Sequence, residues 1–149
     1  MHDDVIWEVI LMKEIYDDLD ESDYSRNCIK YISCYPFAVH IYSEPQIKLL
    51  VDAIAADCGV LYFDATGSVL AKISGQPKKL FYYALLLKGN DEGDPPVPVA
   101  ELISNSHNTV DVTNFLMRLQ REVIQVRSNS RTPQHIEIDI LRLTNTQHF

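Results

Sequence analysis

The sequence of 149 residues contains no apolar run that approaches the length of about 20 residues needed by a membrane-spanning helix. Its N-terminus, Met-His-Asp-Asp, lacks the positive charge and the long apolar stretch of a signal peptide, so the sequence predicts an intracellular protein. Three cysteines, an odd number without a Cys-x-x-Cys pair, fit a reducing compartment. The spacing of Cys28, Cys34, His40 and Cys58 is not that of a zinc site. Walker, Gly-x-Gly-x-x-Gly and Gly-x-Ser-x-Gly motifs are also absent.

An excess of basic residues is lacking as well, which argues against a free-standing nucleic-acid binder. The formal net charge is −8, and residues 1–24 hold all of it, with nine acidic residues and one basic residue. The rest of the chain carries twelve residues of each sign. The nearest approach to a basic patch is formed by Arg118, Arg121, Arg127 and Arg131, which we interpret as the solvated face of a helix.

A hydrophobic fraction of 46% and a charged fraction of 23% are typical of one globular domain rather than of a disordered chain. We expect an acidic helical segment over residues 1–35 and the main domain over residues 36–149. Near the N-terminus apolar residues recur every three or four positions, which predicts an amphipathic helix that ends near Asp20. Packing within the chain is the commoner arrangement for such a helix, and a protein partner or self-association through residues 1–20 is the alternative.

Further along the chain the hydrophobic pattern alternates between strand and helix periods. The predicted strands cover residues 37–42, 60–63, 80–87, 97–103 and 136–140, and the predicted helices begin at Ser43-Glu44-Pro45 and at Asn108 or Thr109. Gly59 is expected to end the first of these helices in a left-handed conformation. Asp64 is expected to close its strand just before a turn at Thr66-Gly67, and residues 21–30 are predicted as turns. Pro98 restricts its strand to an edge of the sheet or to its own first positions.

This order of elements predicts a mixed α/β domain in which three antiparallel strands are followed by a helix and a parallel strand. A right-handed crossover would place the strand over residues 136–140 beside the strand over residues 60–63. Asp64 and Asp139 would then become neighbours in space. Two carboxylates so close repel each other unless a cation lies between them. Mg²⁺ or Mn²⁺ binds carboxylates together with waters and phosphate oxygens, and two such ions assist phosphoryl transfer. The pattern therefore predicts Asp64 and Asp139 as metal ligands and catalytic residues.

Five segments of the sequence resemble the catalytic core of Mutator-like DDE transposases and of their animal relatives. These segments are residues 36–40, 60–69, 80–84, 96–101 and 106–107. The most specific part is Asp-Ala-Thr-Gly, followed at the right distance by the strands with Tyr-Tyr and Pro-Val-Ala-Glu. The resemblance covers roughly residues 35–125. It implies a ribonuclease-H-like fold, metal-dependent cleavage and joining of DNA strands, DNA as a partner, and a nuclear location.

In that family two aspartates and a later glutamate hold the metal ions. The resemblance implies that Asp64 matches the first aspartate and Asp139 the second, with Mg²⁺ or Mn²⁺ as the cofactor. No acidic residue follows Asp139 in the sequence, so the third acid has no counterpart here. We therefore expect an N-terminal piece or a degenerate, inactive copy of a transposase core. Without the later elements, one sheet face and one edge would be uncovered, which favours aggregation or dependence on a partner.

Other interpretations of the same residues stay open. Asp64 before Thr-Gly is alternatively a turn residue that accepts hydrogen bonds from nearby N–H groups, and Asp139 a solvent-facing strand residue. Asp-Ala-Thr-Gly also resembles the phosphorylation motif of cation-pumping ATPases and haloacid-dehalogenase-like enzymes, but the second loop of that motif set is absent. Tyr82 and Tyr83 are predicted to pack within their strand, and His107 to belong to a turn. The competing function is a non-catalytic interaction or oligomerisation module on the same scaffold.

Overall fold

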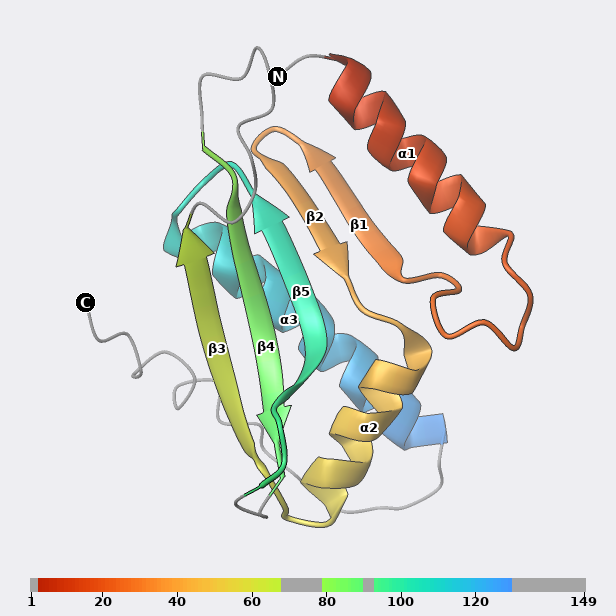
Figure 1. Ribbon diagram of the computed structural model, residues 1–149, viewed down its shortest axis with the longest axis vertical. Coiled ribbons are helices and arrows are strands. Elements are labelled where there is room, and N and C mark those ends of the chain that lie inside the picture. The colour runs from red at the N-terminus through yellow and green to blue at the C-terminus, as the bar shows by residue number, and fades with distance from the viewer. Residues whose placement is uncertain (1–2, 68–78, 90–92, 130–149) are drawn as a thin grey trace.

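A computed structural model describes residues 3–67, 79–89 and 93–129 of the chain. The elements are, in chain order, α1 (Asp3–Asp17), β1 (Ile29–Cys34), β2 (Phe37–Ile41), α2 (Glu44–Ala55), β3 (Val60–Gly67), β4 (Phe81–Lys88), β5 (Val97–Ser104) and α3 (Thr109–Asn129) (Figure 1). The five strands form one sheet in the order β1-β2-β5-β4-β3, and every neighbouring pair is antiparallel. The prediction of a mixed α/β architecture is confirmed. The predicted parallel strand over residues 136–140, which contains Asp139, lies outside the described residues.

The strand β1 was not predicted, because the polar residues before it led residues 21–30 to be interpreted as turns, although Ile29, Tyr31 and Ile32 favour a strand. It pairs with β2 over the register from Ile29–Ile41 to Cys34–Phe37, with an irregularity after Ile29. Ile29 itself is buried and packs against Phe37 and Val39. The predicted division between residues 1–35 and 36–149 therefore falls at the turn of a hairpin, and residues 29–34 belong to the sheet.

The strand β3 is longer than predicted, and the turn expected at Thr66-Gly67 is wrong. Its pairing with β4 continues from Val60–Lys88 to Gly67–Phe81, so the ladder of hydrogen bonds holds Thr66 and Gly67 in extended structure. A local Thr-Gly pattern favours a turn, but pairing with a remote partner strand overrides it. Asp64 consequently lies in the middle of β3, opposite Ala84, and does not close the strand.

The strand β5 lies in the middle of the sheet, between β2 and β4. Pro98 occupies its second position, which fits the predicted restriction to the first residues of the strand. The pairing of β4 with β5 shifts between Leu85 and Leu86, next to the point where Pro98 pairs with Leu86. The Pro98 carbonyl accepts a hydrogen bond from Gln46 Nε2 of α2 at 3.0 Å, which ties α2 to the start of β5.

The helix α2 begins where the sequence predicts, but it ends at Ala55, and Asp57 rather than Gly59 takes the positive φ directly after the C-cap. Ser43 is its N-cap, Pro45 lies in its first turn, and the Gln46 side chain accepts a hydrogen bond from the Ser43 backbone N–H at 2.7 Å. After the helix, Gly59 has a φ of +89°, and a Cβ there would lie 2.9 Å from the Lys88 carbonyl oxygen. Both the conformation and the space therefore require glycine at this position.

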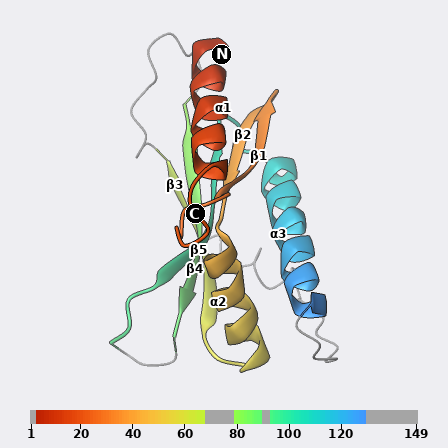
Figure 2. The same ribbon diagram turned by 90° about the vertical axis from the view of Figure 1, so that its right-hand side faces the viewer.

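The helices α2 and α3 cover one face of the sheet and enclose the larger core. This core consists of Ala38, Tyr42, Ile47, Leu50, Val51, Tyr83, Leu85, Leu87, Val99, Ala100, Leu102, Phe115, Leu116, Leu119 and Val123. The helix α1 packs on the opposite face at the β1–β2 end of the sheet, where Val9 and Tyr16 contact a smaller apolar cluster. Figure 2 shows the β1–β2 hairpin standing between α1 and α3.

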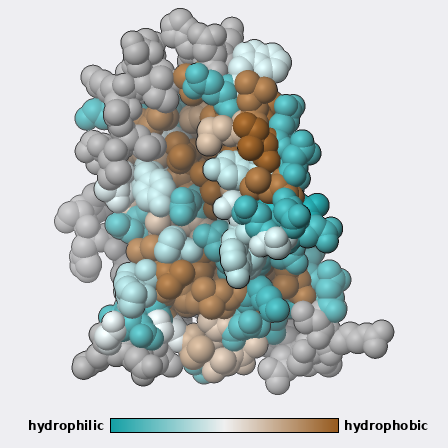
Figure 3. Space-filling model, turned by 45° about the vertical axis from the view of Figure 1, so that its right-hand side comes forward, coloured by the Kyte–Doolittle hydropathy of each residue, from teal (hydrophilic) through white to brown (hydrophobic). Residues whose placement is uncertain are grey.

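The outer side of α1 is also apolar. Trp7, Leu11 and Ile15, spaced by four residues, are 62%, 54% and 63% exposed. Figure 3 shows apolar residues gathered over the upper part of this side of the molecule, with polar residues beside them. The helix is thus apolar toward the sheet and apolar toward solvent, which is unusual for a helix that only caps a domain.

Phe115 anchors α3 in the larger core, and its removal tests this packing. The side chain is fully buried and contacts the rings of His40 and Phe63. We expect Phe115→Ala to lower the free energy of unfolding by about 3–5 kcal/mol, because it leaves a cavity where α3 meets the sheet. Val110→Ala, at an exposed position of the same helix, should change it by less than about 0.5 kcal/mol. Similar losses in the two variants, measured by urea denaturation, would contradict this account of the core.

Candidate functional site

The alternation of side chains along the strands brings two acidic residues to the sheet face that α2 and α3 leave open. Asp64 of β3 pairs with Ala84 of β4, and Ala84 pairs with Glu101 of β5. Residues directly opposite each other in a sheet lie on the same face. The two carboxyl-bearing residues therefore flank the small side chain of Ala84, with their Cα atoms two strand spacings, or about 9.5 Å, apart.

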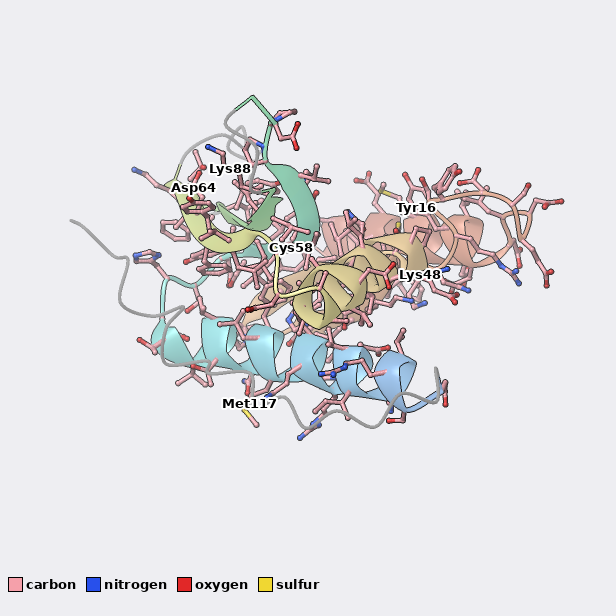
Figure 4. The ribbon with its side chains drawn as sticks, turned by 90° about the horizontal axis from the view of Figure 1, so that it is seen from below. Tyr16, Lys48, Cys58, Asp64, Lys88 and Met117 are labelled. Carbon is pink, nitrogen blue, oxygen red and sulfur yellow. The ribbon has the colours of Figure 1, made fainter. Side chains whose placement is uncertain are left out.

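Asp64 is exposed on this face and has few partners of its own. Thr66 Oγ1 lies 3.4 Å from Asp64 Oδ2, which is a weak hydrogen bond at most. Asp64 also lines a hollow of about 450 Å³, together with Tyr62, Leu86 and Lys88. Figure 4 shows Asp64 and Lys88 on the side of the sheet away from α3. A carboxylate with free oxygens at the wall of an open hollow is accessible to a cation with its waters.

Glu101 has a different environment, and no role for it was predicted. It is half-buried, and its carboxylate is hydrogen-bonded to the hydroxyl of Tyr82 on β4. Burial, then the Glu101 charge and this hydrogen bond, raise the pKa of Tyr82 above its usual value. Glu101 is thus already engaged by a neighbour on the same face. The alternation of apolar and polar residues in β5 indicates on which side of the strand Glu101 lies. Only the register of the sheet shows that Glu101 is two strands away from Asp64.

Of the two predicted metal ligands, only Asp64 lies among the described residues. Within residues 3–67, 79–89 and 93–129 no group of three or more His, Cys, Asp or Glu side chains converges on one point. Mg²⁺ is commonly held by only one or two carboxylates and several waters, and Asp64 is an exposed carboxylate of the required kind. The predicted second ligand, Asp139, lies outside the described residues. Asp64 is exposed on the open face. Its role as a metal ligand and its pairing with Asp139 both stay predictions.

A second hollow lies on the opposite face, between the β1–β2 hairpin and α3, and we call it the α3 groove. It has a volume of about 310 Å³, and its walls include Tyr31, His40, Asp111, Asn114, Arg118 and Arg121. The Arg118 guanidinium carbon lies 3.9 Å from the centre of the Tyr31 ring, which is a cation–π contact. Two of the four arginines interpreted as a solvated helix face thus line a groove. Sequence reasoning missed it because the facing wall comes from a hairpin some 80 residues earlier in the chain.

His40 forms the floor of the α3 groove and is 2% exposed. Its ring centre lies 4.7 Å from that of Tyr31 and 5.2 Å from that of Phe115. Burial, together with the nearby Arg118 charge, lowers the pKa of His40 from 6.5 to about 4. The imidazole is therefore neutral at pH 7, and its buried Nδ1 has no hydrogen-bond partner among the described residues.

His107, which was predicted only as a turn residue, joins β4 to the segment before α3. Its Nδ1 lies 2.6 Å from the hydroxyl oxygen of Tyr83, and its ring stacks on Phe81 with 4.9 Å between the centres. Tyr83 is 1% exposed and belongs to the core, as its predicted packing role requires. Asn108 then caps α3, since its Oδ1 accepts a hydrogen bond from the Asp111 N–H at 2.8 Å. We assign the pair of His107 and Tyr83 a structural role.

No family model, no curated protein and no solved structure matches this chain. None of the helices in the described residues is both long enough and apolar enough to cross a membrane. The candidate sites therefore rest on the geometry of the two sheet faces.

The environment of His40 predicts how stability depends on pH. Between about pH 6.5 and pH 4 the unfolded chain binds a proton at this residue and the folded chain does not, so stability falls as the pH is lowered through this window. We expect this one residue to account for a loss of about 3 kcal/mol across the window. The His40→Phe variant should lose that part of the pH dependence, as measured by urea denaturation at several pH values. An NMR titration midpoint for the His40 ring near 6.5 would contradict the assignment.

Proposed function

We propose that this chain carries the first part of a ribonuclease-H-like core of DDE-transposase type, with Asp64 as a ligand for Mg²⁺ or Mn²⁺. One observation carries the proposal. The antiparallel strands β3, β4 and β5 are followed by α3 on the covered face, and Asp64 projects from the middle of β3 onto the open face. Most of the described residues that resemble the transposase core lie on this unit or on the segment that joins β5 to α3, whereas residues 36–40 belong to β2. The chemistry proposed for the family site is metal-dependent cleavage and joining of DNA strands.

The direction of the strands supports a place for the predicted strand over residues 136–140. The strands β3 and β5 run in the same direction, because each of them is antiparallel to β4. Among the described residues β3 pairs with β4 alone, so its other edge has no partner strand in this part of the chain. A right-handed crossover from β5 through α3 would return the chain to that edge, parallel to β3. Asp139 would then come to lie beside Asp64.

Two carboxylates side by side at that position would favour the binding of a divalent ion. Each would raise the pKa of the other unless a cation offset their repulsion. When bound, Mg²⁺ or Mn²⁺ would supply charge stabilisation for a phosphoryl group, and Asp64 would hold and orient the ion at the open face. By the resemblance, Asp64 and Asp139 would correspond to two of the three acids that the transposase family uses, and the proposal for this chain is therefore metal binding at a site of that ancestry.

A metal titration tests the proposal. We expect Mg²⁺ in the low-millimolar range to shift the ¹H–¹⁵N signals of Asp64 and its neighbours in a saturable manner, and Mn²⁺ to broaden the same signals. Asp64→Asn and Asp139→Asn should each weaken binding by about tenfold or more, since each removes a charged ligand.

Asp52→Asn is the matched control, because Asp52 is an exposed carboxylate on α2. It should leave the affinity unchanged. Shifts that do not saturate, or that are equally weakened by the Asp52 substitution, would mean that the ion is attracted only by the general negative charge of the chain, and the proposal would fail.

The outer side of α1 favours a second candidate function, that of a protein-interaction module. Trp7, Leu11 and Ile15 form an exposed apolar stripe, and Val9 and Tyr16 hold the helix to the sheet from its other side. Acidic residues surround the stripe, because all of the excess negative charge lies in residues 1–24. Two copies meeting through this surface would bring these charges together, and a partner with an apolar strip bordered by lysine or arginine complements it instead.

Trp7 is the only tryptophan in the chain and reports directly on this surface. We expect a synthetic amphipathic helical peptide of leucine and lysine to shift its fluorescence to shorter wavelengths, because the indole would leave water. Ile15→Glu should abolish the shift, whereas Val110→Glu, at an exposed position of α3, should not. An equal shift with a peptide of leucine and glutamate, or no shift with either, would rule out the basic partner. Dimerisation of the chain alone, measured by sedimentation, would also rule it out.

A further inference from the structure

The α3 groove has a wall with two positive charges at one end. Arg118 and Arg121 are three residues apart on α3 and both line it, so their side chains start about 5–6 Å from each other. Neither takes part in a salt bridge among the described residues. Two adjacent guanidinium groups repel each other, and a ligand that carries two negative charges would relieve this repulsion.

Arg118 is held in place before any ligand arrives. Its Cζ atom lies 3.9 Å from the centre of the Tyr31 ring, and this ring is in turn packed on the buried His40. A guanidinium stacked on an aromatic ring keeps its N–H groups free at the edge, and these match the oxygens of a phosphate or carboxylate. Little side-chain entropy remains to be lost when an oxyanion binds, which favours affinity.

The other end of the groove has hydrogen-bonding groups without positive charge. Asp111 and Asn114 line it and precede Arg118 by about two and one turns of α3, or roughly 10 and 6 Å along the axis. The Asp111 Oδ2 atom is buried and has no hydrogen-bond partner among the described residues. Buried carboxylate oxygens normally accept a hydrogen bond, and a hydroxyl group of a ligand would donate one here.

From this arrangement we propose that the α3 groove binds a small phosphate monoester, with the phosphate on Arg118 and Arg121 and hydroxyl groups toward Asp111 and Asn114. A monoester carries nearly two negative charges at pH 7 and matches two guanidinium groups, whereas each phosphate of a nucleic acid carries one. The volume of about 310 Å³ fits a small molecule. The net charge of −8 further disfavours a polyanion. This site lies on the sheet face opposite Asp64 and does not depend on the proposed metal function.

NMR titration of the full chain tests the proposal, with inorganic phosphate, glycerol 3-phosphate and a single-stranded oligonucleotide as probes. We expect glycerol 3-phosphate to shift the side-chain signals of Arg118 and Arg121 and the ring signals of His40 in a saturable manner, and to bind more tightly than inorganic phosphate. Arg118→Gln and Arg121→Gln should each weaken binding by about tenfold or more, because each removes a charge-assisted hydrogen bond. Arg118→Lys should weaken it less, because it keeps the charge but loses the planar fork.

Lys48→Gln is the matched control, because it removes one positive charge from the exposed side of α2, outside the groove (Figure 4). It should leave binding unchanged. Thermal melting of each variant checks that it is folded, and Arg121, which is exposed, keeps the test valid if Arg118→Gln does not fold. The proposal is overturned if no probe gives saturable shifts, if Lys48→Gln weakens binding as much as the groove variants, or if the oligonucleotide binds more tightly per phosphate than glycerol 3-phosphate.

Discussion

The antiparallel pairing of β4 with β3 on one side and β5 on the other determines which side chains lie on each face of the molecule. In this register Phe63 and Tyr83 point into the core beneath α3, while Asp64 and Ala84 point to the open face. A shift of one residue would bury the carboxylate and expose the aromatic rings. The core and the candidate metal ligand are therefore consequences of the same hydrogen-bond ladder.

The two faces offer different chemistry because they are covered differently. The helices α2 and α3 bury one face, and the groove beside α3 is lined by aromatic side chains and two arginines, with His40 kept neutral at its floor. On the other face, α1 is the only described helix, and it lies at the β1–β2 end, whereas Asp64 on β3 is exposed and lines a hollow. A hydrated cation suits the second environment, and a phosphate held by arginine suits the first.

Much of the fold was predictable because its signals are local. The apolar spacing of α1, the cap and proline of α2, and the periodic core positions of α3 need no knowledge of the rest of the chain. The second half of β3 was not predictable in this way, because its extended structure depends on pairing with β4. The strand β1 was missed although its partner β2 follows directly in a hairpin, because the polar residues before it favoured turns. Asp64 was found from its local motif, whereas the position of Glu101 follows from register, and the α3 groove from the packing of a helix on a distant hairpin.

The most direct test of the central proposal is whether Asp64 and Asp139 are neighbours. In a chain with Cys28, Cys34 and Cys58 replaced by serine, the paired substitution Asp64→Cys and Asp139→Cys should give an intramolecular disulfide on mild oxidation, because neighbouring strands bring Cα atoms within bonding range. The pair Asp64→Cys and Ala84→Cys, which are opposite each other in the sheet, is the positive control. If the control pair closes and the thiols at positions 64 and 139 stay free, the account of a paired carboxylate site is contradicted.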